Sequence, residues 1–347
     1  MAYISGIQQI GIGCADAHKT FAWLRKIFEL NVKIFDDEAS ADLMTAYTGG
    51  EVHARRAILA MNMNGGGGAE IWQFTSRIPQ AGKKVLWGDY GINAVKFKSN
   101  FVENSYQGLQ KNISCTQPEK DPAGSLSFLL NDDAGNQYQV VHDTSWFKNK
   151  KNMLGGVCGA IIGVSNIDLS VAFYQNGLGI SNILYDVTGK FNDLGEDAKN
   201  HSYRRVLLHF ENPYTAPFSR LLGDIQIELI QALDRKAEKT YENRFWGDVG
   251  FIHLCFDVPK MSQLRANLEK FKYMLRIDSG ETFDMGKSGG RFAYVEDPDG
   301  TLIEMVETHK VPILKIFGIY LNLKKLKPGK PLPDWMVRLM GLNKVKD

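Results

Sequence analysis

The segment WGDVGFIHLCF (Trp246–Phe256) decides the fold, because it repeats an earlier segment, WGDYGINAVKF (Trp87–Phe97). Four further segments of the first half recur in the second half in the same order. They are GIQQIGIGCADAHKTFAWL at Gly6 with VCGAIIGVSNIDLSVAFY at Val157, ARRAILAMN at Ala54 with YRRVLLHFE at Tyr203, AEIWQ at Ala69 with IELIQ at Ile227, and DDAGNQYQVV at Asp132 with DPDGTLIEMVE at Asp297. A repeated order of this kind predicts a tandem duplication.

Each half of the chain divides again into two units. The first unit has the strand-like IQQIGIGCAD, then AHKTFAWLRKIFEL with apolar residues at helical spacing, then the strand-like NVKIF, RRAILAMN and AEIWQF. The other quarters repeat this order, with helices expected near residues 106–112, 169–178 and 261–272. The sequence therefore predicts an α+β protein built from four βαβββ modules.

Length and composition exclude several classes of protein. A chain of 347 residues suits two domains of about 150 residues each. The net charge is +2 and no basic, aromatic-rich motif is present, so we expect no nucleic-acid partner. The four cysteines form no CxxC pair, which argues against a zinc knuckle or a redox dithiol. With no signal peptide and no apolar run of about 18 residues, a cytoplasmic location is expected.

Three phrases carry a resemblance to a known superfamily: SVAFYQNGLGI at Ser170, IHLCFDV at Ile252 and FAYVEDPDGTLIEMVE at Phe292. The pattern resembles the vicinal oxygen chelate superfamily, which includes glyoxalase I, extradiol dioxygenases and bleomycin resistance proteins. The resemblance implies that pairs of modules curl into two half-open barrels. It also divides the chain into glyoxalase-like domains at residues 1–150 and 151–309, followed by a basic, apolar extension at 310–347.

In that superfamily, a divalent metal is held by side chains from the first and last strands of the paired modules. Carried onto this sequence, the rule gives two positions in each module. They are Gln9 and Glu70, Ala94 and Gln139, Gly159 and Glu228, and His253 and Glu304.

Which modules pair decides whether a complete metal site exists. If neighbours pair, one barrel holds Gln9, Glu70, Ala94 and Gln139, and the other holds Gly159, Glu228, His253 and Glu304. If the first module pairs with the fourth, one barrel holds Gln9, Glu70, His253 and Glu304, and the other is nearly devoid of ligands. We favour the second arrangement, because one complete site and one lost site is the simpler account.

The chemistry of that quartet suits one divalent ion, either Zn²⁺, Ni²⁺, Co²⁺ or Mn²⁺. By resemblance to glyoxalase I, we expect an isomerase, epimerase or lyase that acts on a small molecule with adjacent oxygens through an enediolate. Glu304 is the first choice for the catalytic base and Glu70 the second. Two alternatives stay open. One is an Fe(II) dioxygenase, although Gly159 stands where such relatives carry a histidine, and the other is a metal-free binding or resistance protein.

The faces of the strands refine these expectations. Glu70 and Glu304 each alternate with apolar residues, and a buried carboxylate without a partner is costly. Gly11 and Gly13 share the face of Gln9 and would leave room for a ligand. Glu228 is expected to lack partners in its barrel. The arginines of the two repeated Arg-Arg pairs are expected to serve only the fold: Arg55, Arg56, Arg204 and Arg205.

The C-terminal extension lies outside the repeat. Residues 311–347 contain eight Lys and Arg against two Asp, a net charge of +6. LPDWMVRLMGL is expected to form a short helix with Trp335, Leu339 and Leu342 along one side. The extension is either a strap packed over the barrels or a segment that contacts a membrane or lipid. The sequence leaves a homodimer open.

Overall fold

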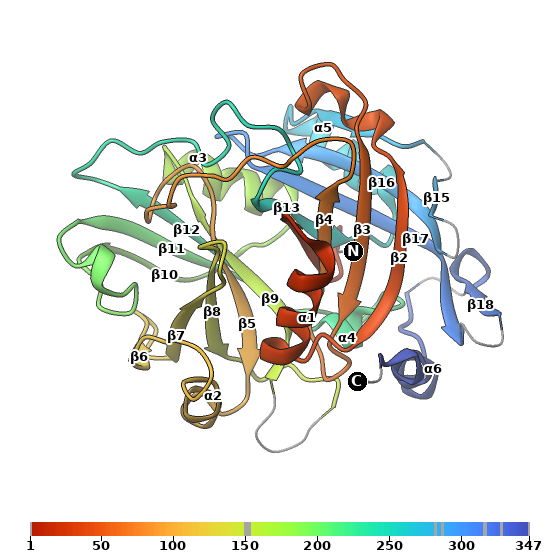
Figure 1. Cartoon of the computed structure of the whole chain (residues 1–347), viewed down its shortest axis with the longest axis horizontal. Helices are drawn as coiled ribbons and strands as arrows, with labels where there is room; N and C mark the ends of the chain where they lie inside the picture. Colours follow the sequence, from red (N-terminus) through yellow and green to blue (C-terminus); the bar gives the residue numbers. More distant parts are fainter. Residues whose placement is uncertain are drawn as a thin grey trace.

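The computed structural model describes residues 2–148, 154–280, 283–285, 288–314, 318–326 and 329–345, which form the four expected modules (Figure 1). The first module is β1 (Ile7–Gly13), α1 (Ala17–Phe28), β2 (Val32–Ser40), β3 (Ala54–Met61) and β4 (Gly68–Phe74). The second is β5 (Gly91–Ser99), α2 (Val102–Leu109), β6 (Glu119–Lys120), β7 (Leu126–Asn131) and β8 (Gln137–His142).

The second half of the chain repeats this order with additions. The third module is β9 (Leu154–Gly163), α3 (Ile167–Ala172), β10 (Asn182–Gly189), β11 (Tyr203–Phe210), α4 (Ser219–Leu222) and β12 (Ile225–Ala232). The fourth is β13 (Gly250–Asp257), α5 (Met261–Lys270), β14 (Leu275–Asp278), β15 (Phe283–Met285), β16 (Ser288–Glu296) and β17 (Leu302–Leu314). The chain continues with β18 (Ile319–Asn322) and α6 (Asp334–Met340).

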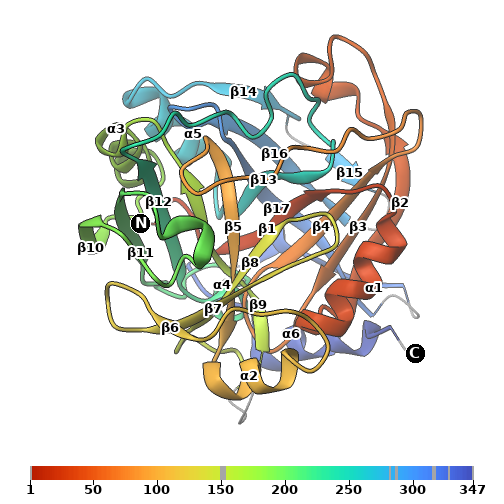
Figure 2. The ribbon, with the colours of Figure 1, turned by 60° about the vertical axis from the view of Figure 1, so that its left-hand side comes forward.

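The strands form two curved sheets that lie side by side (Figures 1 and 2). One sheet has the order β14-β16-β17-β13-β1-β4-β3-β2, with β15 and β18 added at β16 and β17. The other has the order β10-β11-β12-β9-β5-β8-β7-β6. The first module therefore pairs with the fourth, as favoured, and the second with the third. We call these the outer barrel and the inner barrel; each takes one module from each half of the chain.

Of the two predicted domain boundaries, only the second lies within the described residues. The boundary between residues 150 and 151 lies outside the described residues. The boundary between residues 309 and 310 falls inside β17, which continues without a break to Leu314. The extension thus begins as part of the outer barrel's sheet.

The repeated Trp-Gly-Asp turns join the two modules within each barrel in equivalent ways. The turn carbonyls of Asp248 and Asp89 lie so close to Gly13 and Gly163 that a Cβ on either glycine would sit 1.9 Å from the carbonyl oxygen. Both aspartate carboxylates are buried and accept from an arginine. The glycines after the first strands are therefore required for close backbone packing, and Gly13 does not leave room for a ligand.

The helices follow their sequence signals. Asp16 caps α1 by accepting from the backbone N–H groups of His18 and Lys19. The apolar face of α1 packs toward the inner barrel, where Phe28 stacks on Phe97 with ring centroids 3.8 Å apart. The helix expected at residues 106–112 begins earlier, at Val102. The third helix continues from Ala172 into a π-helical turn, Phe173–Gly177.

The C-terminal extension packs against the outer barrel, and its helix α6 forms as predicted. Its buried residues are Val337 and Met340, whereas Trp335 is 60% exposed and Leu342 63% exposed. The helix therefore turns Val337 and Met340 toward the barrel, and the side predicted to carry Trp335, Leu339 and Leu342 is only partly buried, at Leu339. No helix among the described residues is both long and apolar enough to span a bilayer. The predicted membrane or lipid contact stays a prediction.

Candidate metal centre

The four predicted ligand positions lie on four neighbouring strands of the outer barrel. Glu304 is on β17, His253 on β13, Gln9 on β1 and Glu70 on β4, in that order across the sheet. Strand β1 runs parallel to β4 and antiparallel to β13, which itself runs parallel to β17. This topology brings the first and last strands of two modules together at the centre of the sheet, so their side chains converge on its concave face.

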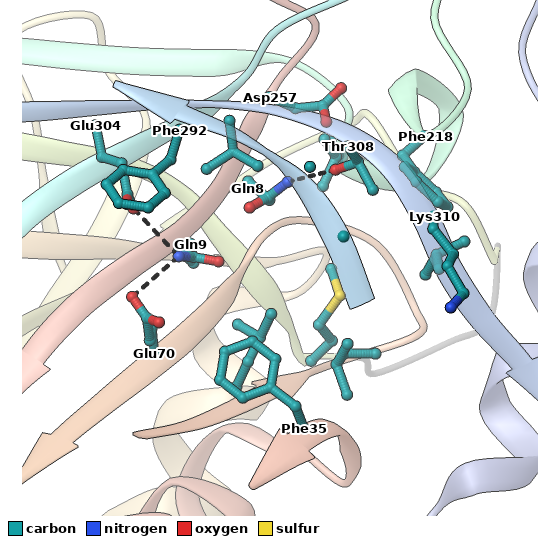
Figure 3. A pocket seen from close by; sticks show the side chains of 18 of the residues that line it. Gln8, Gln9, Phe35, Glu70, Phe218, Asp257, Phe292, Glu304, Thr308 and Lys310 are labelled. Carbon is teal, nitrogen blue, oxygen red and sulfur yellow. Dashed lines mark hydrogen bonds between the residues drawn. The ribbon is translucent and has the colours of Figure 1, made fainter. Parts of the chain in front are cut away.

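The four side chains meet in a small buried cluster, here called the quartet. The Nε2 atom of His253 lies 3.2 Å from Glu304 Oε2 and 3.5 Å from Glu70 Oε2. The amide nitrogen of Gln9 lies 3.2 Å from Glu70 Oε2 and 3.3 Å from Glu304 Oε2 (Figure 3). All four residues are at most 6% exposed. The structure thus brings together every residue that the sequence assigned to the favoured site.

The orientation of His253 is fixed by its surroundings. A Cβ on Gly11 would lie 2.4 Å from the imidazole ring, so the glycine makes room for His253 rather than for a ligand. On the other side, the hydroxyl of Tyr294 lies 3.4 Å from Nδ1, and Trp246 lies nearly parallel to the ring. Because Nδ1 faces Tyr294, Nε2 is the nitrogen that points into the quartet.

Sequence reasoning missed Tyr294, although a signal for it was present. The turn DPDG closes a hairpin in which β16 pairs with β17, and this register places Tyr294 directly opposite Glu304. Directly opposite residues share one face of a sheet. Counting back from the turn would therefore have placed the tyrosine beside the proposed metal ligand.

The quartet is electrostatically unbalanced. Burial alone would lower the pKa of His253, but the carboxylates of Glu304 and Glu70 outweigh it and raise the pKa to about 9. Burial likewise opposes the ionisation of Glu304, yet His253 holds the pKa of this carboxyl below its usual value. Even with a charged imidazolium, two carboxylates leave the cluster one negative charge in excess.

The donor set fits a divalent ion. Ligand atoms of Glu70, His253 and Glu304 all lie within 4.8 Å of one another, the one such cluster of three in the part of the chain that the structure describes. Two ligand atoms each about 2.1 Å from one ion lie about 3.0 to 3.5 Å apart, which matches the distances around Nε2. Within the described part of the chain, Oε1 of Gln9 is buried without a hydrogen-bond partner, and Nε2 of His253 faces the two carboxylates. Two carboxylates with a neutral imidazole carry the charge that a divalent cation neutralises.

A cavity of about 130 Å³ opens onto the quartet (Figure 3). Gln9, Glu70 and Glu304 form one end of it, whereas His253 lies below the surface of the cavity. The side chains of Phe35 and Phe292 flank this end. A small molecule in the cavity would therefore meet the two carboxylates and the amide directly.

The inner barrel has lost the corresponding cluster. By strand register, Ala94, Gln139 and Gly159 stand where the outer barrel has His253, Glu304 and Gln9. Glu228 is retained at the position that corresponds to Glu70. It was expected to lack partners in its barrel, but the structure shows two. Lys96 lies 2.7 Å from it and Arg205 2.6 Å, all three being buried.

Arg205 also shows that the alignment of the Arg-Arg pairs was out of register by one residue. Glu70 lies opposite Leu59 and Glu228 opposite Leu207, so Arg205 corresponds to Ala57 and not to Arg56. A shift of one residue moves a side chain to the other face of a strand. Arg205 therefore points into the inner barrel, where it also pairs with Asp193 at 2.7 Å.

Comparison with known proteins supports the fold. No protein-family model matches the sequence, and no curated protein matches it either. A Bacillus subtilis structure assigned provisionally as a dioxygenase has 12% sequence identity and a TM-score of 0.57, covering 88% of this chain and 86% of its own. Glyoxalase I from Zea mays has 12% identity and a TM-score of 0.54, covering 87% of this chain and 92% of its own. At these identities the likeness shows the fold alone.

Proposed function

We propose that this chain, which has the tandem two-barrel fold of the vicinal oxygen chelate superfamily, is a metal-dependent isomerase, epimerase or lyase of the glyoxalase type. The observation that carries the proposal is the quartet. Two buried carboxylates, one imidazole and one amide converge at the end of a cavity, and the imidazolium of His253 can balance only one of the two carboxylates. We expect Zn²⁺, Ni²⁺, Co²⁺ or Mn²⁺ as the resident ion.

Each residue of the quartet has a distinct role in this proposal. Gln9, Glu70, His253 and Glu304 would hold the ion, with the amide of Gln9 turned so that its oxygen faces inward. The ion supplies Lewis-acid stabilisation of the charge that develops on the adjacent oxygens of the substrate. Glu304 is assigned as the base that takes a proton from the carbon next to these oxygens, with Glu70 as the second choice.

The number of imidazoles disfavours the dioxygenase alternative. Fe(II) oxygenases use two histidines and one carboxylate, whereas the quartet has one histidine and two carboxylates. Gly159, the position at which such relatives were expected to carry a histidine, lies in the inner barrel. The corresponding position in the outer barrel is Gln9. The metal-free binding protein stays an alternative that metal analysis decides.

Elemental analysis of the purified protein tests the proposal first. We expect about one equivalent of a divalent metal in the wild type and none in the variant His253→Ala, Glu304→Ala. Gln139→Ala, at the inner-barrel position that corresponds to Glu304, serves as the matched control and should keep the metal. A wild-type protein that takes up none of the four ions would refute the proposal and leave the metal-free alternative.

Proton transfer tests the assigned base. In D₂O, the metal-loaded protein should exchange the C–H next to the carbonyl of an α-hydroxy ketone such as hydroxyacetone, observed by NMR. Glu304→Gln keeps an oxygen ligand but cannot accept a proton, so exchange should fall by about 10²- to 10⁴-fold while metal is retained. If Glu70→Gln shows this loss and Glu304→Gln does not, the two roles are reversed.

A further inference from the structure

The cavity next to the quartet is lined mainly by apolar side chains. Beyond the polar end at Gln9, Glu70 and Glu304, its wall consists largely of hydrophobic residues (Figure 3). They include Phe35, Leu59, Met61, Phe218, Leu222 and Met340. Burial of such side chains around an empty space favours an occupant that is itself apolar.

Part of this wall comes from a segment of the inner barrel's third module. The connection between β11 and β12 spans residues 211–224, whereas its counterpart between β3 and β4 spans only residues 62–67. The longer connection carries α4, whose Leu221 and Leu222 line the cavity of the other barrel. A Cβ on Gly6 would lie 2.3 Å from Leu222, so α4 is packed closely onto the outer barrel.

The C-terminal extension supplies another part of the wall. Met340 of α6 lines the cavity and is 2% exposed. The extension is tied to the α4 segment by a hydrogen bond from Leu332 N to Pro217 O and by the ion pair of Arg220 with Asp334. Two segments outside the common strands of the outer barrel thus meet at the cavity and close it with hydrocarbon.

The polar groups at the far end of the cavity bond with one another. Gln8 donates to Thr308 across 3.1 Å, and Ser5 donates to the carboxyl of Asp257. Burial raises the pKa of Asp257 to about 6, as expected for a carboxyl in an apolar surrounding. Arg291 is paired with Asp278 at 2.6 Å. These groups are engaged within the protein, and Lys310, which also lines the cavity, lies over the ring of Tyr320. The apolar wall is therefore the main surface left for recognition.

We propose that the substrate is an amphiphile, with two adjacent oxygens at one end and a hydrocarbon body that lies along the α4 and Met340 wall. This orientation of the substrate in the cavity rests on the proposed function, because the quartet would hold the metal ion that binds the two oxygens. The hydrocarbon contact supplies the affinity for the body of the substrate, and the extension acts as a specificity element.

A series of 2-hydroxy acids tests this substrate class by calorimetry on the metal-loaded protein. 2-Hydroxybutanoate, 2-hydroxyhexanoate and 2-hydroxyoctanoate share the adjacent oxygens and differ only in hydrocarbon length. Each buried methylene should lower Kd about three- to fourfold, so the hexanoate should bind about tenfold more tightly than the butanoate. Equal or weaker binding by the longer acids would overturn the inference.

Variants of α6 locate the hydrocarbon contact. Met340→Glu should remove most of the dependence of Kd on hydrocarbon length. Trp335→Glu lies on the exposed side of the same helix and should leave the dependence intact. Phe218→Gln is the second variant should Met340→Glu not fold. A dependence on length that survives both wall variants would overturn the assignment of the wall.

Octanoate lacks the 2-hydroxyl group and so does not offer oxygens on two adjacent carbons. It therefore separates this inference from the proposed function. With metal present, octanoate should bind more weakly than 2-hydroxyoctanoate. If the protein holds no metal but binds both acids equally and with the same dependence on length, the proposed function fails while the apolar site stands. If metal is present and hydrocarbon length has no effect on Kd, the inference of an amphiphilic substrate fails while the proposed function stands.

Discussion

The two barrels share one architecture but balance their buried charges in opposite ways. In the inner barrel, Glu228 and Asp193 are matched by Lys96 and Arg205, so the cluster is neutral without any ligand. In the outer barrel, Glu70 and Glu304 face a single imidazole. Because an unbalanced buried charge is costly, the comparison teaches that the inner barrel balances its own buried charges, whereas the outer barrel keeps an excess of negative charge that suits the proposed cation.

The largest expected effect is a loss of stability when the charge balance of the inner barrel is broken. Glu228→Gln leaves two buried cations with one carboxylate, so we expect a loss of about 3 to 5 kcal/mol in the free energy of unfolding. Urea denaturation at pH 7 measures it. The exposed pair of Glu196 with Lys199 is the control, and Glu196→Gln should change stability by less than about 1 kcal/mol. A similarly small effect of Glu228→Gln would show that the cluster is not the structural counterpart of the quartet.

The pH dependence of stability tests the same cluster with a slightly smaller effect. Burial opposes the charge of Glu228, but Arg205 and Lys96 outweigh it and hold the pKa at about 2. Since the folded pKa is below the unfolded one of about 4.5, the contribution is complete above pH 4.5 and is lost as the pH falls toward 2. It amounts to about 3 kcal/mol.

Unfolding curves of wild type and Glu228→Gln between pH 2.5 and 6 isolate this contribution. The stability difference between the two proteins should shrink as the pH falls. A difference that is constant over this range would contradict the assignment.

The third largest expected effect is a loss of stability when a side chain is added at Gly159, the counterpart of Gln9. A Cβ on Gly159 would lie 2.1 Å from the backbone oxygen of Gln226, so Gly159→Ala should destabilise the protein by about 1 to 3 kcal/mol. Gln9→Ala needs no such adjustment and should cost less in the metal-free protein. Thermal unfolding of both variants makes the comparison. Full tolerance of Gly159→Ala would show that the inner barrel can accept a side chain at its ligand position.

The smallest expected effect is a loss of metal affinity that tests the role of Tyr294. Tyr294→Phe removes the hydroxyl that faces Nδ1 of His253, so metal affinity should fall about tenfold, as measured by competition with a chelator. Tyr138→Phe removes a hydroxyl that donates to Asp132 in the inner barrel, and it should leave metal affinity unchanged. Equal effects of the two variants would mean that Tyr294 acts only through general stability.

Local patterns could predict the modules and the position of each site residue within its module. His253 and Glu304 could be located because they follow repeated turns, which set the register of their strands. The pairing of modules could only be favoured, since either partner presents a similar strand edge to β1. The choice between partners is made by packing between segments far apart in the chain.

Other features depend on contacts that a sequence comparison does not show. Arg205 was misaligned because the two Arg-Arg pairs look alike while their strands differ by one residue in register. Gly11 was interpreted as space for a ligand, yet the ring of His253 fills it from a neighbouring strand. The sequence did not decide which side of α6 is buried, because both sides of the helix contain large apolar residues.

The pairing of the first module with the last one also has a consequence for biosynthesis. The inner barrel's strands are contiguous from Gly91 to Ala232, so they can assemble while the chain is still being made. The outer barrel must wait, because Gln9 and Glu304 are 295 residues apart. Until β13 and then β17 emerge from the ribosome, Gln9 and Glu70 lack His253 and Glu304. The quartet thus forms only after Glu304 has been translated, and a chain interrupted before this residue cannot acquire it.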